Sequence, residues 1–177
     1  NQAADAITFT KQELCADNPD TIIKRAHIAN ALLAKGISTA MDQAFKKYLQ
    51  YGGRYCPQKE HLSPEEVVKT LISNGAFVAL AHPFQYKFGD KKTEELIAHL
   101  ADLGMKGLVV YHSSNNKLES MKLQEMAVRH HLLPTGGSDF HGGNKPDISI
   151  GTGRGGLRVS SLLLEDIKRE RAKQALS

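Results

Sequence analysis

Four side chains that can bind a metal ion or move a proton each follow an apolar run of the sequence: His82, His112, Asp139 and His141. The runs are typical of buried strands, and they cover residues 76–81, residues 107–111 and a third stretch that begins at Leu132. Because ligands bind at the carboxyl ends of the strands in parallel sheets and barrels, we expect these side chains to face one site.

The glycine-rich segment 136–143 carries the most specific of these patterns. On an extended Asp-x-His segment, Asp139 and His141 point to the same side of the strand. A carboxylate oxygen with imidazole nitrogens suits Zn²⁺, Mn²⁺ or iron and is too rich in nitrogen for Ca²⁺. The glycines allow the backbone to approach a ligand closely. The alternative is a glycine-rich turn in which Asp139 accepts hydrogen bonds from backbone N–H groups.

Taken one at a time, the histidines also have structural interpretations. His82 alone is as compatible with a hydrogen-bonded core histidine as with a metal ligand. For His112, a hydrogen bond at a strand end and a contact to substrate fit the sequence equally well. The pair His130 and His131 complements a helix C-terminus, and we interpret it as structural.

The elements that position these side chains alternate between helix and strand. Residues 63–66 (Ser-Pro-Glu-Glu) combine an N-cap, a proline and acidic residues, so they predict a helix start, with Val67-Val68 and Leu71-Ile72 as its buried stripe. The run 76–81 then predicts a strand covered on both faces. The remaining expected elements are a helix capped at Thr93, a strand over 107–111, a helix over 118–130 and a strand from Leu132. This order predicts βαβ units and a parallel sheet.

Residues 1–62 contain helical patterns and no β-rich run. The expected helices start at a capping box of Thr10 and Glu13, at Asp20 for a helix over 21–35 with Ile22 on its packed face, and at Ser38. Such short helices bury little core, so we expect a small lobe that lies over the same edge of the sheet as the histidines.

Composition limits the class of protein. The 177 residues predict one domain, or one domain with a small lobe, and 41% hydrophobic with 24% charged residues indicate a globular chain. The net charge of +4 is compatible with an anionic partner without specifying one. Two cysteines are too few for a disulfide framework, so we expect a cytoplasmic protein. No apolar run is long enough to cross a bilayer, so no membrane partner is expected.

Several stretches resemble a known family. Residues 81–83 (Ala-His-Pro) and 137–142 (Gly-Ser-Asp-Phe-His-Gly) are similar to the last two metal motifs of the PHP (polymerase and histidinol phosphatase) family. The most similar branch is that of the stand-alone metal-dependent phosphoesterases, which includes a 5′-to-3′ exoribonuclease and nucleotide phosphatases. Residues 25–29 (Arg-Ala-His-Ile-Ala), with Tyr48-Leu49 ahead of Gly52-Gly53, resemble the helical insertion of this branch. The resemblance therefore covers nearly the whole chain.

The resemblance implies a distorted (β/α)7 barrel that holds up to three divalent metal ions (Mn, Zn or Fe). Residues 1–62 would be the helical insertion lobe, and residues 63–177 the C-terminal βα units of the barrel. The implied activity is hydrolysis of nucleotide or short-oligonucleotide phosphoesters by a metal-activated water.

The matching positions imply roles for individual residues. Ligand and catalytic positions match His82, Asp139 and His141, and the residues expected to contact substrate are His112, Ser138 and Lys145. In two places the chain departs from its relatives: Gln85 stands where Arg is frequent, and Val109 where Glu is frequent.

The first motifs of the family are absent from this sequence. It contains no His-x-His near the start, no Thr-Asp-His and no partnered Glu. We therefore expect the chain to supply part of a metal site, as the second half of such a protein. We also expect it to pair with the missing N-terminal half or with another copy of itself.

Two other functions are compatible with the sequence. The helices over 22–35 and from Ser38 resemble a helix-turn-helix, in which Lys24-Arg25 and Lys46-Lys47 would meet nucleic-acid phosphates. Against this, the second helix has no obvious polar recognition face and the basic residues do not gather on one side. The other alternative is a structural half-barrel without catalysis, which the absent motifs favour.

Overall fold

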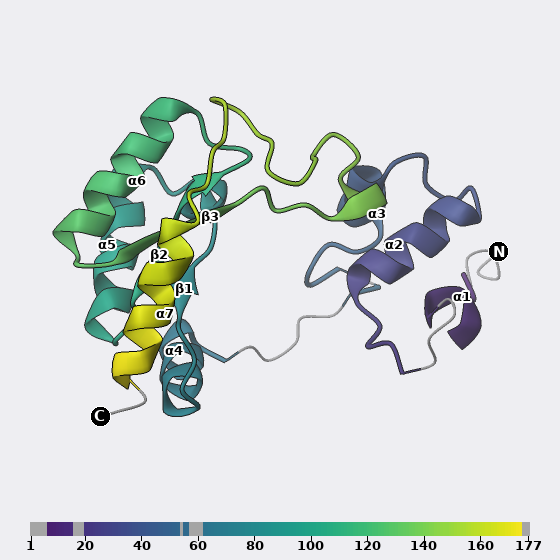
Figure 1. The fold of residues 1–177 in the computed structure, drawn as a ribbon. Helices are drawn as coiled ribbons and strands as arrows, with labels where there is room; N and C mark the ends of the chain where they lie inside the picture. The colour runs from purple at the N-terminus through teal and green to yellow at the C-terminus, as the bar shows by residue number, and fades with distance from the viewer. Residues whose placement is uncertain (1–6, 16–19, 54, 57–61, 175–177) are drawn as a thin grey trace. The chain divides into compact units, whose positions relative to one another are not determined.

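A computed structural model describes residues 7–15, 20–53, 55–56 and 62–174 of the chain. The chain divides into two compact units, Asn1–Glu60 and His61–Ser177 (Figure 1). Each unit has its own hydrophobic core. The predicted boundary after residue 62 adjoins residues 57–61, which lie outside the described residues. The assignment of the first unit as an insertion lobe stays a prediction.

The described part of the first unit is helical, with α1 (Lys11–Cys15), α2 (Arg25–Ala34) and α3 (Met41–Lys47). Its core consists of four buried side chains: Ala29, Leu32, Ala44 and Leu49. The capping box at α1 is confirmed, because the Glu13 N–H donates to the Thr10 hydroxyl at 3.2 Å and the Thr10 N–H donates to the Glu13 carboxylate at 2.6 Å.

Helix α2 begins at Arg25, so the prediction of a start at residue 21 is wrong. The His27 Nδ1 accepts the Lys24 N–H at 3.0 Å and thereby satisfies a backbone donor at the helix start. Ile22, which was expected on the packed face, is 79% exposed.

Helix α3 also begins later than predicted, at Met41. Ser38, the expected cap, is buried, and its hydroxyl lies 3.0 Å from the Gln43 side-chain oxygen. The same oxygen accepts the Thr39 N–H at 2.9 Å. The glutamine therefore holds the turn before the helix, and Ser38 does not cap the first helical turn.

The second unit has the predicted α/β class with a parallel sheet. Its strands, in the spatial order β1-β2-β3, are β1 (Ala79–Leu80), β2 (Gly107–His112) and β3 (Leu133–Gly137). Its helices are α4 (Pro64–Ser73), α5 (Asp90–Asp102), α6 (Lys117–Arg129) and α7 (Leu162–Gln174), with 3-10 turns at η1 (Pro83–Tyr86) and η2 (Gly142–Asn144). Helix α7 was not among the predicted elements.

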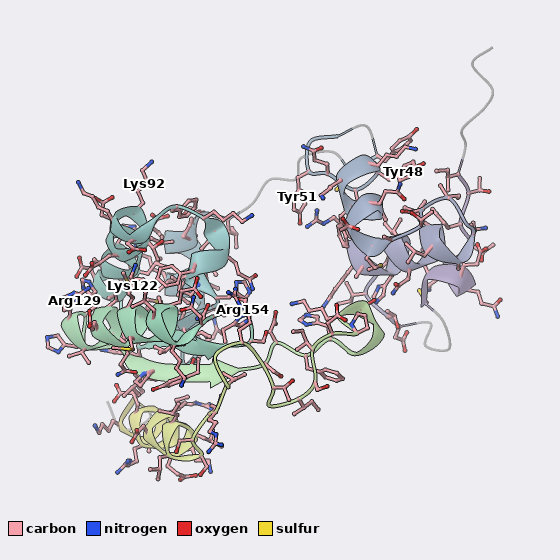
Figure 2. All side chains as sticks on the ribbon, turned by 90° about the horizontal axis from the view of Figure 1, so that it is seen from above. Tyr48, Tyr51, Lys92, Lys122, Arg129 and Arg154 are labelled. Carbon is pink, nitrogen blue, oxygen red and sulfur yellow. The ribbon has the colours of Figure 1, made fainter. Side chains whose placement is uncertain are left out.

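The core of this unit lies between β2 and the helices α5 and α6. Leu108 and Val110 of β2 are fully buried against α5 and α6, whose core side chains are Ile97, Leu100, Leu123 and Met126. Two ion pairs join α6 to α5 at the surface, Lys122 to Asp90 at 2.5 Å and Arg129 to Glu94 at 2.7 Å (Figure 2). Burial of these aliphatic side chains contributes far more to the stability of the unit than the exposed ion pairs do.

Strand β1 and helix α4 are less buried than predicted. The strand covers two residues instead of six and is only half-buried, because β2 is its sole strand neighbour within the described residues. On α4 only Val68 is buried, whereas Val67, Leu71 and Ile72 are exposed to between 36% and 41%. The expected N-cap and helix start of α4 are confirmed: the Glu66 N–H donates to the Ser63 hydroxyl at 3.2 Å.

Helix α5 begins at Asp90, three residues before the predicted cap at Thr93. Thr93 instead faces the core, and its buried hydroxyl finds no hydrogen-bond partner in the described part of the chain. Among the described residues, no helix is long and apolar enough to cross a membrane.

Candidate metal centre

His82 lies two residues beyond the end of β1, at the carboxyl edge of the sheet. Its backbone is left-handed (φ 35°, ψ 55°), a conformation that is costly for a residue with a Cβ and that turns the chain into η1. The His82 ring meets the His112 ring edge-on, with 5.6 Å between the centroids. His82 Nδ1 is buried and has no hydrogen-bond partner among the described residues.

An irregularity in β2 sets the direction of His112. The register with β3 shifts between Val109 and Tyr111, as in a β-bulge, and such bulges re-aim side chains. The Tyr111 hydroxyl donates to Gln124 of α6 at 3.4 Å, so Tyr111 faces the helix. His112, the next residue, faces His82 and Asp139.

The contacts of His112 define its tautomer. The Ser114 backbone N–H donates to His112 Nδ1 at 3.1 Å, and the Ser114 hydroxyl lies 2.8 Å from the same atom. Because Nδ1 accepts, the proton of the neutral ring is on Nε2. Nε2 lies 3.6 Å from Asp139 Oδ2, buried and without a hydrogen-bond partner among the described residues. Burial lowers the pKa of His112, and the opposing charge of Asp139 does not restore it, so the ring favours the neutral form.

Asp139 follows β3 and lies between three nitrogen-bearing side chains. The Lys145 ammonium donates to Oδ2, His112 Nε2 lies 3.6 Å from the same oxygen, and His141 Nδ1 lies 3.7 Å from Oδ1. Burial alone would raise the pKa of Asp139, but Lys145, His141 and His112 outweigh it and hold that pKa below its usual value. The carboxylate is therefore ionised, and its backbone, like that of His82, is left-handed (φ 56°).

His141 is held by the backbone of the turn that it shares with Asp139. Its Nδ1 lies 2.7 Å from the Asp139 carbonyl oxygen, which can only accept, so Nδ1 carries a proton. The lone pair is thus on Nε2. This is the arrangement common in metal-binding histidines, where a carbonyl partner sets the tautomer and leaves the other nitrogen for the metal. The side chain is 51% exposed.

The remaining predicted residues are already engaged within the chain. Ser138 is buried, and its hydroxyl accepts the Gly151 N–H at 3.3 Å. Lys145 contacts Asp139. Pattern analysis missed Ser114, because a serine two residues beyond a strand carries no periodic signal. Gln85 also contributes: its amide donates to the Ser114 hydroxyl at 3.3 Å and so joins the loops after β1 and β2.

The donor types suit a divalent cation. They are the buried His82 Nδ1 without a partner, the His141 Nε2 lone pair and the ionised Asp139 carboxylate. They do not yet converge. Within residues 7–15, 20–53, 55–56 and 62–174, no three His, Cys, Asp or Glu side chains are arranged to hold one ion. The described donors therefore do not form a metal site by themselves.

Three of the four basic residues proposed for a helix-turn-helix make contacts within the chain. Lys46 lies 3.4 Å from Asp42, and the Lys47 ammonium lies 5.0 Å from the centre of the Tyr48 ring. The Arg25 guanidinium covers the Tyr51 ring at 3.6 Å. These intramolecular contacts compete with any contact to nucleic-acid phosphates.

Comparison with known proteins identifies relatives of this arrangement. The chain is 31% identical to a 3′,5′-nucleoside bisphosphate phosphatase of Chromobacterium violaceum, over 76% of this chain and 47% of that protein. It is 30% identical to the 5′-3′ exoribonuclease Rnm of Escherichia coli, over 67% of this chain and 41% of the relative. The chain thus spans about half the length of the curated relatives it matches. No family model matches the chain.

Solved structures show the same fold. A crystal structure described as a putative metal-dependent phosphoesterase of Bifidobacterium adolescentis superimposes with a TM-score of 0.62 at 30% identity, over 82% of this chain and 49% of that one. A structure of an amidohydrolase from Chromobacterium violaceum, with bound sulfate and no metal, gives 0.66 at 29% identity, over 89% and 53%.

The parallel sheet, the residues at its carboxyl edge and these similarities place the chain among homologues of bacterial metal-dependent phosphoesterases. The chain is similar to enzymes of the PHP family and matches the C-terminal part of these longer relatives.

Proposed function

We propose that this chain contributes to a metal-dependent phosphoesterase that hydrolyses nucleotide or short-oligonucleotide phosphoesters, and that its strand ends supply part of the metal site. The observation that carries the proposal is a pair of buried imidazole nitrogens, His82 Nδ1 and His112 Nε2, without hydrogen-bond partners among the described residues. The two rings are in contact, and His112 Nε2 lies 3.6 Å from the Asp139 carboxylate. Buried polar atoms without a partner are rare and indicate a place for an ion or ligand. The activities named for the relatives support the substrate class.

His82, Asp139 and His141 would hold the ion through imidazole nitrogen and carboxylate oxygen, a donor set that Mn²⁺, Zn²⁺ and iron accept. When bound, a divalent ion supplies a water of lowered pKa and positive charge for phosphoryl oxygens. The chain prepares the ligands: the Asp139 carbonyl sets the His141 tautomer, and the neighbouring nitrogens keep the Asp139 carboxylate ionised.

Two further side chains would act on the substrate. His112 carries its proton on Nε2, which faces the centre, so it would donate a hydrogen bond to a phosphoryl or leaving-group oxygen. Once an ion is bound, the Lys145 ammonium would leave the Asp139 carboxylate and contact a substrate phosphate instead. Ser138 would hold the glycine-rich turn in place through Gly151.

The remaining ligands would come from outside this chain. The chain spans about half the length of its relatives, and the described residues lack a complete ligand group. We therefore assign residues 63–177 to the C-terminal βα units of a (β/α)7 barrel and residues 1–62 to a helical insertion. The other ligands would be supplied by a segment that corresponds to the N-terminal half of the relatives, or by another copy of the chain.

The test compares the 177-residue chain alone with the chain plus a polypeptide that corresponds to that N-terminal half, both with Mn²⁺. We expect weak Mn²⁺ binding and little hydrolysis of a nucleoside bisphosphate or short oligonucleotide by the chain alone, and turnover by the combination. Asp139→Ala should abolish this turnover, whereas the exposed control Asp147→Ala should retain it. Hydrolysis by the chain alone, as a monomer and insensitive to chelator, would contradict the proposal. Absence of turnover from the combination would favour a structural role.

A further inference from the structure

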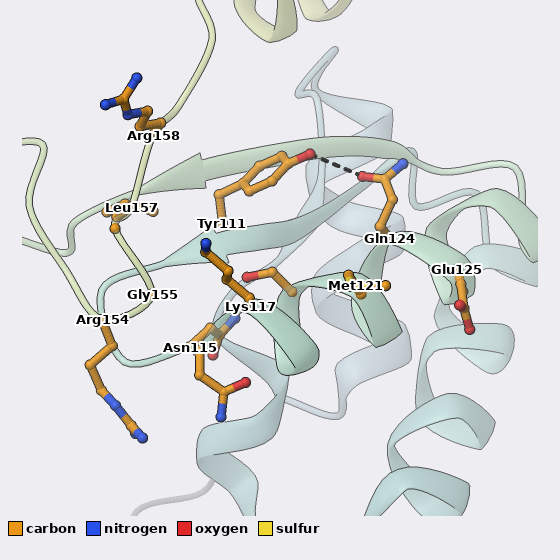
Figure 3. Close-up of a pocket in the computed structure, with 13 residues that line it drawn as sticks. Tyr111, Asn115, Lys117, Met121, Gln124, Glu125, Arg154, Gly155, Leu157 and Arg158 are labelled. Atoms are coloured by element: carbon orange, nitrogen blue, oxygen red, sulfur yellow. Dashed lines mark hydrogen bonds between the residues drawn. The ribbon is translucent and has the colours of Figure 1, made fainter.

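A pocket of about 490 Å³ lies between the first turns of α6 and the segment 154–158 (Figure 3). The Tyr111 ring and the side chains of Met121 and Leu157 supply its apolar surface. Its volume is within the range of sites that bind small molecules.

Close backbone contacts form the wall of this pocket. The Arg154 N–H donates to the Ser113 carbonyl at 2.8 Å. A Cβ on Gly153 would lie 2.5 Å from the Ser113 Cα, and a Cβ on Gly155, where φ is 67°, would lie 3.0 Å from the Lys117 nitrogen. Only glycine allows this approach, so the segment is tied to the loop between β2 and α6.

The charges of the pocket favour an anion. Lys117, Arg154 and Arg158 line it, and within the described residues none of the three forms an ion pair with a carboxylate. Glu125, the acidic residue of the lining, lies 3.9 Å from Arg129. Three cations beside an apolar surface that includes an aromatic ring suit a ligand with a phosphate and a planar ring.

One residue joins this pocket to the candidate metal centre. The Ser114 hydroxyl lies 2.8 Å from His112 Nδ1, while the Ser114 carbonyl accepts a hydrogen bond from Arg154 Nη1 at 3.1 Å. The two sites are therefore neighbours, separated by a single loop residue.

We infer that the pocket binds a nucleotide unit, namely the nucleotide that adjoins the scissile phosphoester of an oligonucleotide. Its base would lie on the apolar surface and its phosphate would meet Arg158. The Arg154 side chain, which points the other way in Figure 3, would stay hydrogen-bonded to the Ser114 carbonyl. This inference rests on the proposed function, since the neighbouring centre gives the nucleotide its place in a longer substrate. A free mononucleotide has the same chemistry, and the experiment separates the two.

The first experiment measures binding of a 5′-phosphorylated dinucleotide with a 3′ fluorescent label to the full 177-residue chain, in the presence of a chelator. Fluorescence anisotropy should show saturable binding that Arg158→Gln weakens about tenfold, the effect of removing one charged hydrogen bond. The matched control is Arg171→Gln, an exposed arginine on α7 outside the pocket lining, which changes the net charge equally. No binding by the unaltered chain, or equal loss in both variants, would overturn the inference.

A second pair of variants tests the apolar surface without touching a cation. Met121→Glu places a negative charge in the pocket, and Val128→Glu places one on the same helix outside the lining; the two side chains are 60% and 65% exposed, so both variants should fold. Only Met121→Glu should weaken binding. An unlabelled mononucleotide that competes as strongly as the unlabelled dinucleotide would overturn the assignment to a neighbouring nucleotide of an oligonucleotide.

The chelator keeps this result independent of the proposed function. If binding depends on Arg158 but the protein never hydrolyses the dinucleotide, the inference about the pocket would stand and the proposed phosphoesterase function would be refuted. If oligonucleotides are hydrolysed and neither Arg158→Gln nor Met121→Glu changes the turnover, the phosphoesterase function would stand and the inference about the pocket would be refuted.

Discussion

The Asp139 carboxylate accepts a hydrogen bond from the Lys145 ammonium at the group that the proposed metal ion would also bind. Lys145 supplies the positive charge that an ionised, largely enclosed carboxylate requires. If the proposed ion binds at Asp139, the ammonium and the ion would compete for the same oxygen. The charge of the carboxylate would then be balanced either by the lysine or by the ion.

Lys145→Met should raise the affinity for Mn²⁺ a few-fold, because it removes the competing ammonium from an ion pair worth at most about 1 kcal/mol. Isothermal titration calorimetry on the 177-residue chain measures the affinity directly. Lys145→Arg keeps a cation and should bind Mn²⁺ as the unaltered chain does. Weaker binding in Lys145→Met would mean that the lysine supports the ion instead of competing with it.

The sequence predicted the positions of the candidate residues better than their contacts. His82, His112 and Asp139 stand at strand ends, where the apolar runs placed them. The tautomers of His112 and His141 depend on a Ser114 backbone N–H and an Asp139 carbonyl, and backbone groups carry no signature in a sequence.

At the scale of helices and strands, local signals were reliable and packing was not. Ser63 caps α4 as predicted, because the cap and the Glu66 N–H that it satisfies are only three residues apart. Thr93 was expected to cap a helix as well, but its side chain is buried in the core and α5 begins earlier, at Asp90. Tertiary packing overrides a local propensity of this size.

Thr93→Val should stabilise the chain by about 1 kcal/mol, because it removes a buried hydroxyl that has no partner among the described residues while keeping the side-chain shape. Urea-induced unfolding, followed by circular dichroism, measures the change. Thr70→Val, at an exposed position of α4, serves as the matched control and should change stability little. Destabilisation by Thr93→Val would indicate that the hydroxyl has a bound partner such as water.

The hydrogen-bonded Glu65 carboxylate between α4 and α5 should make stability depend on pH in the acid range. Glu65 lies 2.7 Å from His99, and hydrogen bonds from its own backbone N–H, from His99 and from Ser63 lower the pKa of Glu65 from 4.5 to about 2. A lowered pKa in the folded state means that the contribution is present above pH 4.5 and is lost as the pH falls toward 2.

The measurement compares the unaltered chain with Glu65→Gln in urea unfolding at pH 7, 4.5 and 3. The unaltered chain should be the more stable at pH 7, and the difference should shrink between pH 4.5 and 3. A difference that stays constant over this range would show that protonation of Glu65 does not contribute.

At the scale of the whole molecule, the second unit leaves surface that a closed fold would cover. Within the described residues β1 and β3 each have one strand neighbour, so both outer edges of the sheet present unpaired backbone groups. Val67, Leu71 and Ile72 of α4 are exposed to more than a third. The sequence pattern predicted these side chains as buried, because periodicity reports an apolar face but not what covers it.

We expect the chain to associate, with its own copies or with a polypeptide that completes the sheet. Analytical ultracentrifugation should show a mass that rises with concentration, and Leu71→Lys should shift it toward the monomer by placing a charge on the exposed apolar face of α4. The exposed Thr70→Lys, on the same helix outside that apolar face, should leave it unchanged. A strictly monomeric chain at all concentrations would contradict this expectation.

The left-handed backbone at His82 and Asp139 has a consequence for how this protein would respond to selection in the laboratory. A residue with a Cβ in that conformation costs about 1 kcal/mol relative to glycine, and the chain bears this cost at two of its three candidate ligands. A screen that rewards only heat resistance would therefore favour glycine at both positions. The survivors would keep the sheet and its helices, and they would lose the imidazole and the carboxylate that such a screen never measures.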